Sequence, residues 1–395
     1  MIQAILALCA RDLSHDTMLT QLDQSLAAFQ RHGGSWSQLI REAERQGVAP
    51  LLYKHTRLLN YAIPVNERRM LQGLYLRNRH SNSIRNKAVQ DILHLCSQQG
   101  TPLLLVKGIA LANFAYDEIG LRPMRDIDLL IHKDDIGKVK DILYQLGYRP
   151  DEKHAVPDNY YHLTPMNKNI DGLPVSMEVH HNLLPFHPQY PLWPLEKSYD
   201  TAWEFKINGI TARTLNLEDT LWYVYLHGFR APLTYEPFRL VHVADLVTLV
   251  EKFSEKIDWQ SASKEMRILS NALSCLHHLT PWPQHIREEL ELNIPDRPQR
   301  VGFPYEGWPL RKIQKTPWAK LPQLARKTLW PSQWWVQLYY GHMQGRGYCK
   351  ARCIDHPRML WRWIKAYWHA HRTAALLPTE TKVPQSRSKG IGRAE

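Results

Sequence analysis

The stretch "RPMRDIDLLI" (residues 122–131) sets two aspartates, Asp126 and Asp128, at the head of an otherwise apolar run. The run has the length and composition of a β-strand, in which residues i and i+2 face the same side. Asp126 and Asp128 are therefore predicted to share one face, while Ile127 and Leu129 face the other. Two neighbouring carboxylates repel each other, and burial makes both harder to ionise. A divalent cation held between them would explain the arrangement.

A second strand-like run, "VSMEVHH" (175–181), supplies a third carboxylate. Glu178 and His180 alternate with apolar residues, so both are predicted to project from one face of a strand. Mg²⁺ or Mn²⁺ binds carboxylate oxygens together with substrate phosphates, and a pair of such ions can clamp an in-line phosphoryl displacement. We therefore take Asp126, Asp128 and Glu178 as the candidate catalytic and metal-binding residues.

A strand-to-helix turn in "LLLVKGIAL" (103–111) offers a place for an anion. Gly108 lets the backbone come close to a phosphate, the following helix presents free N–H groups, and Lys107 adds a positive charge. Arg122 and Arg125 either contact a triphosphate or pair with the aspartates on a solvated strand face. His180 is a candidate for orienting the metal ligands. The candidate nucleotide-binding and cofactor-binding residues are Lys107, Gly108, Arg122, Arg125 and His180.

The pattern of the chain predicts an α+β fold, with a small mixed β-sheet core flanked by helical segments. Helical spacing of apolar residues dominates residues 1–95, where Ser35 and Gly47 are the predicted start and stop of one helix. Residues 96–205 alternate strands and helices, and "YYHLTPM" and "PVSMEVHHNL" are predicted to form a hairpin across the spacer "NKNIDG". Helical periodicity returns over residues 206–300.

The positive charge of the chain is concentrated at its C-terminal end. The formal net charge is +12, and residues 301–395 hold 17 Lys or Arg against 4 acids, together with 8 of the 14 tryptophans. We predict a basic, Trp-rich helical extension over residues 301–377 and a disordered tail over 378–395. The extension is expected to pack its tryptophans inward with a solvated basic face. Contact with a polyanion and adhesion to a membrane surface are the alternatives.

The composition is typical of a globular protein, with 44% hydrophobic and 22% charged residues among 395. No apolar run reaches the roughly 20 residues of a transmembrane helix, and the opening residues lack the features of a signal peptide. The five cysteines are scattered, which argues against a disulfide framework. These features predict a cytoplasmic protein without a transmembrane segment.

The ordered set of motifs resembles a known family. The segments "LLLVKGIALANFAY" and "GLRPMRDIDLLI", with the later acid-x-His of Glu178 and His180, are similar to the uncharacterised nucleotidyltransferases of the DNA polymerase β-like superfamily. The resemblance implies transfer of a nucleotidyl group from an NTP such as ATP, with Mg²⁺ or Mn²⁺ and release of pyrophosphate, by a two-metal-ion mechanism. By this resemblance, Asp126 and Asp128 are the two metal ligands and Glu178 is the third acid. Lys107 and Gly108 form the phosphate turn.

Two matters stay open at the level of sequence. The acceptor could be a sugar, a small metabolite, a peptide, a protein side chain or an RNA end. Ile109 follows Gly108 where the superfamily usually has serine or glycine. That departure favours an alternative in which the fold is catalytically degenerate and serves as a module that binds nucleic acid or a protein partner.

Overall fold

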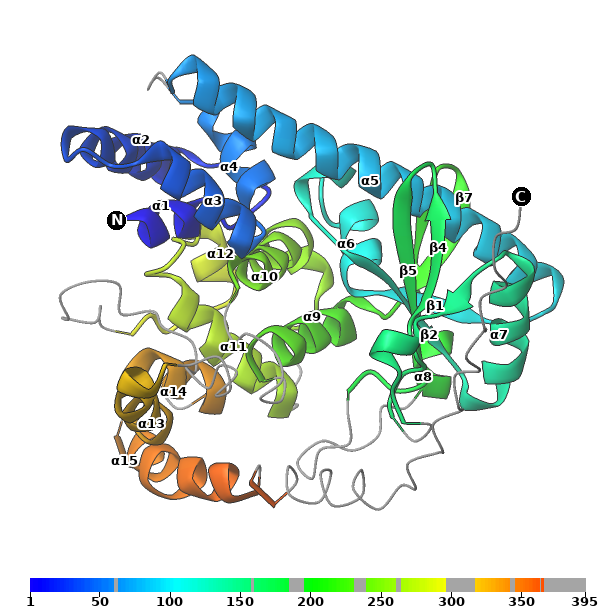
Figure 1. The fold of residues 1–395 in the computed structure, drawn as a ribbon. Helices are drawn as coiled ribbons and strands as arrows, with labels where there is room; N and C mark the ends of the chain where they lie inside the picture. The colour runs from blue at the N-terminus through cyan, green and yellow to red at the C-terminus, as the bar shows by residue number, and fades with distance from the viewer. Residues whose placement is uncertain are drawn as a thin grey trace, which may run out of the picture.

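The computed structural model describes residues 1–59, 63–157, 160–184, 195–230, 239–260, 264–295, 317–341, 345–362 and 364–365. A five-stranded mixed sheet lies beside a helical body, and the long helix α5 (Val65–Gln98) runs from the helical body across to the sheet (Figure 1). The fold is α+β, as predicted. The predicted disordered tail, residues 378–395, lies outside the described residues.

Four helices precede α5, namely α1 (Ile2–Leu8), α2 (Asp16–Arg31), α3 (Trp36–Gln46) and α4 (Ala49–Thr56). Helix α3 begins where the Ser35 hydroxyl accepts a hydrogen bond from the N–H of Gln38. It ends at Gly47, which has the left-handed conformation (φ 74°) that closes many helices. Both predicted ends of this helix are confirmed.

The sheet has the strand order β1-β2-β5-β4-β3. Its strands are β1 (Leu103–Val106), β2 (Asp126–Ile131), β3 (Arg149–Pro150), β4 (Met166–Ile170) and β5 (Leu173–His180). Strands β2 and β5 pair in parallel, and the other neighbours pair antiparallel. Helix α6 (Lys107–Phe114) connects β1 to β2, and α7 (Ile136–Gln145) follows β2. The strand that carries the two aspartates is therefore central and lies directly beside the strand that carries Glu178.

The hairpin of β4 and β5 differs from the prediction. Most of the segment predicted as a spacer belongs to β4, and the turn consists of Asp171 and Gly172. Both turn residues have positive φ (51° and 80°), the geometry of a tight two-residue hairpin turn, which Asp-Gly favours. The segment predicted as the first strand contributes Met166 and an isolated bridge between His162 and His180.

A second hairpin, β6 (Trp203–Ile207) and β7 (Ile210–Thr214), was not predicted. Its turn is Asn208 and Gly209, again with positive φ at both residues (47° and 88°), and Asn-Gly is a strong signal for such a turn. The hairpin packs in the same hydrophobic cluster as the sheet. The predicted end of the core at residue 205 therefore falls inside a hairpin that continues the core to residue 214.

Different elements bury the two faces of the sheet. On one face, Ile127 and Leu129 pack with residues of α5 and α7. On the other, Leu130 packs with residues of α8 (Leu195–Asp200) and α9 (Leu217–Tyr225). This second face is the one to which Asp126 and Asp128 belong, because they alternate with Ile127 and Leu129.

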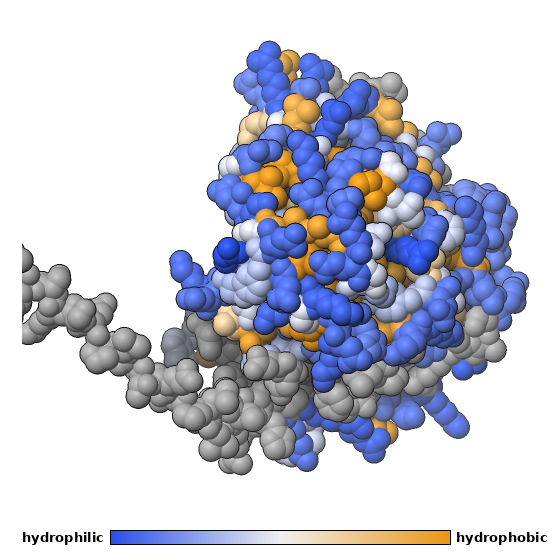
Figure 2. Space-filling model, turned by 90° about the vertical axis from the view of Figure 1, so that its right-hand side faces the viewer, coloured by the Kyte–Doolittle hydropathy of each residue, from blue (hydrophilic) through white to orange (hydrophobic). Residues whose placement is uncertain are grey.

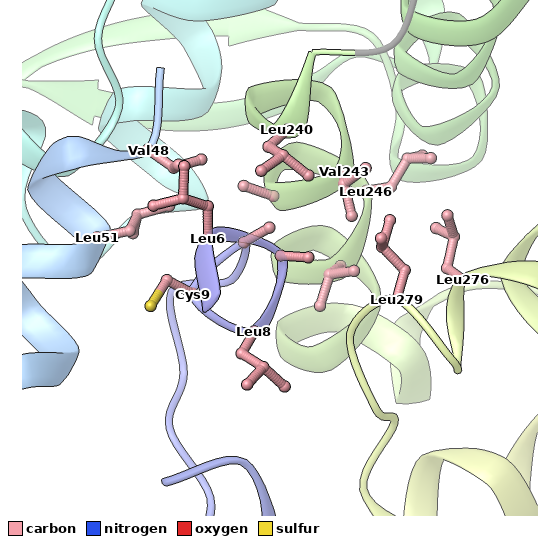
Figure 3. Packing of buried hydrophobic residues seen from close by; sticks show 14 of the residues in the cluster. Leu6, Leu8, Cys9, Val48, Leu51, Leu240, Val243, Leu246, Leu276 and Leu279 are labelled. Carbon is pink, nitrogen blue, oxygen red and sulfur yellow. The ribbon is translucent and has the colours of Figure 1, made fainter. Parts of the chain in front are cut away.

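The helices after the sheet share a core with the helices before it. The helices that follow the sheet in this core include α9, α10 (Leu240–Phe253), α11 (Lys264–Leu276) and α12 (Gln284–Glu289). Figure 3 shows Leu6 of α1 and Val48, which lies between α3 and α4, close to Leu240 of α10. The segments 1–95 and 206–300, predicted separately, thus contribute to one hydrophobic cluster, and the sheet is inserted between them in sequence.

Two lysines and two aspartates form a network that joins distant parts of the chain. Lys54 Nζ lies 2.6 Å from Asp12 Oδ1 and 2.8 Å from Asp117 Oδ2. Lys252 of α10 contacts the same two carboxylates. This bridging network ties the N-terminal helices, the segment after α6 and α10 together.

The described part of the basic extension is helical. It comprises a short 3₁₀ helix (Trp318–Lys320), α13 (Leu321–Leu329), α14 (Gln333–Tyr340), α15 (Gly345–Lys350), a π-helical turn (Ala351–Asp355) and helical residues 356–362 and 364–365. Trp334 and Trp335 are buried, and Trp334 Nε1 donates to the carbonyl of Cys275 at 2.7 Å. Trp318, Trp330 and Trp361 are exposed. The prediction of inward packing is right for the first two tryptophans and wrong for the other three.

The helices in the described residues include none with both the length and the apolar character needed to cross a membrane. Figure 2 shows the side of the molecule on which α7 lies in Figure 1. Most described side chains on this face are hydrophilic, and the hydrophobic ones form smaller areas between them (Figure 2).

Candidate active site

Parallel pairing of β2 and β5 sets acidic residues side by side. The register places Asp128 opposite Glu178 and Asp126 opposite Ser176. Residues directly opposite each other in neighbouring strands project from the same face of a sheet. Glu178 therefore projects from the face of Asp128, toward the side covered by α8 and α9.

The Asp128 carboxylate is the centre of the contacts. Its Oδ1 accepts hydrogen bonds from Lys107 Nζ at 2.6 Å and from His180 Nε2 at 2.8 Å. The same His180 nitrogen lies 3.5 Å from Glu178 Oε2. One potential ligand atom from each of Asp128, Glu178 and His180 lies within 4.8 Å of the other two. Asp128 and His180 are buried, whereas Glu178 is partly exposed.

His180 is placed to orient both carboxylates. Because Nε2 donates to Asp128, this ring nitrogen carries a proton. Nδ1 has no hydrogen-bond partner within the described part of the chain. Tyr161 and His162 pack beside the ring, with centroid separations of 5.6 and 5.2 Å. Packing thus fixes the ring while its donor nitrogen faces the acids.

Lys107 reaches the acids from a rare backbone conformation. It is the first residue of α6, and its φ of 56° lies in the left-handed region that residues other than glycine seldom adopt. Such strain costs about 1–3 kcal/mol and persists where the surroundings enforce it. The ion pair with Asp128 is one such constraint, since Lys107 Nζ is held in a largely buried position.

Electrostatic surroundings distinguish the three acids. Burial raises the pKa of Asp126 to about 6, and the charges of Asp128 and Glu178 add to this effect. Burial also opposes ionisation of Asp128, but the Lys107 ammonium and the hydrogen bond from His180 outweigh it and hold the pKa of Asp128 below its ordinary value. For Glu178, burial is likewise outweighed, chiefly by the hydrogen bond from His180, and the pKa is lowered. All three acids are therefore mainly ionised at neutral pH.

The donor set fits a divalent cation. Mg²⁺ and Mn²⁺ bind sites rich in carboxylate oxygens, and Asp128 and Glu178 offer such oxygens close together. Asp126 lies on the same face but outside the group whose ligand atoms converge. The structure thus brings together two of the three predicted metal-binding acids, with His180 as the third member of the group.

The two predicted arginines have different surroundings. Asp245 of α10 binds Arg122 through two hydrogen bonds, Nε to Oδ1 at 3.0 Å and Nη2 to Oδ2 at 2.7 Å. Tyr116 also donates to Asp245. Arg122 therefore ties the segment before β2 to the helical body, while Arg125 is exposed to solvent.

Close packing favours a glycine at position 108. A Cβ there would lie 3.0 Å from Met124 Cβ and 3.2 Å from Arg122 Nη1. The neighbouring Ile109 is fully buried in the cluster beneath the sheet. The Gly108–Ile109 pair thus fills the junction of α6 with the sheet, and the N–H groups of the first turn of α6 are the hydrogen-bond donors at this point.

One histidine that the sequence pattern indicates as a core residue lies on the helical side of the site. His227 lies in a π-helical turn (Leu226–Arg230) that continues α9, and its ring centroid is 5.3 Å from that of His242 in α10. Burial, followed by the nearby charge of Lys107, lowers the pKa of His227 well below its ordinary value. A single histidine in an apolar helix resembles any core histidine, so the sequence carried no signal for this position.

Comparison with known proteins places these observations in context. Residues 32–280 match the sequence model of a family described as "Uncharacterised nucleotidyltransferase". No curated protein matches the chain.

Several solved structures are similar to parts of the chain, among them the following three. A crystal structure of ANT(2")-Ia in complex with adenylyl-2"-tobramycin is 18% identical, covering 44% of this chain and 91% of its own, with a TM-score of 0.31. The lincomycin-bound lincosamide antibiotic adenylyltransferase LnuA is 15% identical, covering 41% and 94%, with a TM-score of 0.29. An antigenic nucleotidyltransferase-like protein from Paracoccidioides brasiliensis is 15% identical, covering 55% and 93%, with a TM-score of 0.35.

Proposed function

The chain belongs to the family of uncharacterised nucleotidyltransferases, and from that premise we propose that it transfers a nucleoside monophosphate from an NTP, such as ATP, to an acceptor. The reaction releases pyrophosphate, depends on Mg²⁺ or Mn²⁺, and takes place in the cytoplasm. The observation that carries the proposal is the convergence of Asp128 and Glu178 on one sheet face, beside Lys107 at the start of α6. Anionic oxygens next to a lysine and a helix N-terminus suit a triphosphate with its cation.

Each residue of the site has a proposed part. Asp128 and Glu178 would hold the cation, and Asp126 is available on the same face for a second ion. When bound, the cation neutralises phosphate charge and lowers the pKa of the acceptor hydroxyl. When the nucleotide binds, the Lys107 ammonium leaves its ion pair with Asp128 and contacts phosphate oxygens. There it stabilises the charge that develops on pyrophosphate. His180 keeps the two carboxylates oriented through its Nε2 proton.

The acceptor must present a nucleophile to the α-phosphorus of the NTP. A sugar, a small metabolite, a peptide, a protein side chain and an RNA end all meet this requirement. The bond from the nucleophile to phosphorus forms as the bond to the bridging oxygen breaks, so pyrophosphate leaves in line.

The test is transfer of label from each α-labelled NTP to components of a cell lysate, with Mg²⁺, with Mn²⁺ and with a chelator. We expect a labelled product that requires the cation and is lost in Asp128→Asn. Asp134→Asn is the matched control, because Asp134 is an exposed acid beyond the end of β2. Cation-dependent NTP binding without any labelled product would instead support the catalytically degenerate alternative.

A further inference from the structure

The helix that ends the described chain has one face packed inward. Ala351, His356 and Met359 are buried against the rest of the protein. His356 also bonds the carbonyl of Thr328 in α13 through Nε2 at 2.7 Å. These contacts fix which side of residues 345–365 faces outward.

The outward side carries large apolar side chains. Ile354, Trp361 and Ile364 are 43%, 58% and 50% exposed. Trp361 and Ile364 recur with Arg358 and Lys365 at the three- and four-residue spacing of one helix face, and Ile354 lies in the π-helical turn before them. Lys365 Nζ lies 5.5 Å from the centre of the Trp361 ring. We call Ile354, Arg358, Trp361, Ile364 and Lys365 the C-terminal surface.

The surroundings of the C-terminal surface are strongly basic. The described residues from 317 to 365 include nine Lys or Arg and one acid, Asp355. Trp330, which is 58% exposed on the adjoining segment, stacks beneath the Arg352 guanidinium at 4.3 Å. Exposed apolar and cationic groups are therefore interleaved with almost no negative charge.

We propose that the C-terminal surface binds the headgroup region of an anionic lipid bilayer. Tryptophan favours the boundary between headgroups and acyl chains, isoleucine gains by entering the apolar layer, and Lys or Arg attracts anionic headgroups. A nucleic acid would match the basic charge and the tryptophan, but Ile354 and Ile364 can neither stack on bases nor pair with phosphates. The aliphatic component is what selects a lipid surface as the partner.

This binding is separate from the proposed transfer reaction. The surface lies in the region of α13 and α15, at the edge of the molecule opposite α5, whereas Asp128 lies in the sheet (Figure 1). Attachment through this edge leaves the strands that carry the acids free to bind nucleotide.

The test is sedimentation of the full chain with vesicles of phosphatidylcholine alone or with about 30% phosphatidylglycerol. We expect binding to the anionic vesicles, and a fall of at least about tenfold in Trp361→Ser/Ile364→Ser. Arg358→Gln/Lys365→Gln should weaken binding at low salt by a similar factor. Met70→Ser/Leu76→Ser, which removes exposed apolar side chains from α5, should bind like the unmodified protein.

Thermal unfolding of each variant checks that the fold is kept, as expected for exposed positions. Equal binding to neutral and anionic vesicles would overturn the proposal, and so would unchanged binding by Trp361→Ser/Ile364→Ser. Binding of single-stranded RNA in place of vesicles, lost in the same variants, would identify a nucleic acid as the partner and also overturn it.

Discussion

Two clusters of charged side chains in this molecule differ in their balance. In the bridging network, two ammonium groups face two carboxylates, and every contact joins opposite charges. On the sheet, the single ammonium of Lys107 faces three carboxylates, of which only Asp128 is in direct contact with it. The bridging network is neutral as a whole, whereas the sheet cluster keeps an excess of negative charge.

This difference distinguishes charged residues that stabilise the fold from charged residues that bind a ligand. Buried charge destabilises a protein unless it is paired, so a neutral network can join three parts of the chain. An excess of negative charge destabilises the metal-free protein, and a bound divalent cation would offset it. Variants of the two clusters should therefore respond in opposite ways.

The largest effect is expected at the centre of the sheet cluster. Asp128→Asn should slow nucleotidyl transfer by roughly 10³-fold, because a catalytic cation contributes several kcal/mol to transition-state stabilisation. The measurement is product formation from an α-labelled NTP under saturating Mg²⁺. A rate close to that of Asp134→Asn would end the assignment of Asp128 as a metal ligand.

In the balanced cluster, we expect loss of stability without loss of cation binding. Lys252→Met should lower the free energy of unfolding by about 3 kcal/mol, because Asp12 is fully buried and loses one of its two lysine partners. Urea denaturation measures this change, with Lys138→Met at an exposed ion pair as the control. Altered Mn²⁺ affinity in Lys252→Met would show that the two clusters are coupled and would break the comparison.

In the unbalanced cluster, removal of a charge should stabilise the protein. The folded-state pKa of Asp126 is raised from 3.8 to about 6, so the folded state binds a proton more readily than the unfolded state, and stability falls as pH rises through this range. With a chelator present, Asp126→Asn should be about 2 kcal/mol more stable at pH 7, with little difference near pH 4. Urea titrations at several pH values test this, and parallel pH profiles would contradict it.

The smallest expected effect is on metal affinity in the absence of nucleotide. Lys107 Nζ occupies Asp128 Oδ1, so Lys107→Met should strengthen Mn²⁺ binding by roughly tenfold, since a competing cation is removed. Electron paramagnetic resonance of free Mn²⁺ gives the affinity, and Lys133→Met is the surface control. Weaker binding in Lys107→Met would mean that the lysine supports the metal site.

Local patterns in the sequence were enough for much of the site. Alternation along two strands determined which face Asp128 and Glu178 occupy, and the resemblance to a family supplied the expectation that the two strands meet. Helix ends such as Ser35 and Gly47 follow from capping chemistry, which depends on a few neighbouring residues. The Asn208–Gly209 turn is equally local, because an Asn-Gly pair by itself favours a tight hairpin turn.

Pairings between residues that are distant in the sequence could not be predicted from local patterns. Arg122 was predicted to contact a triphosphate or to pair with the nearby aspartates, and in the structure it binds Asp245, 123 positions further along the chain. The residues around Arg122 and around Asp245 have no spacing that predicts an ion pair between the two. The same holds for His227, whose proximity to the site depends on how α9 and its π-helical turn meet the sheet.

The cluster shared by the first helices and α10 sets an order of events on the ribosome. Helix α4 ends at Thr56 and α10 begins at Leu240. About 180 further residues must therefore be synthesised, which takes roughly 10–40 s, before the apolar side chains of the first helices can pack against α10. All strands of the sheet emerge within that interval, which allows the sheet to form first. The N-terminal helices therefore complete their hydrophobic cluster only after the whole sheet has been synthesised.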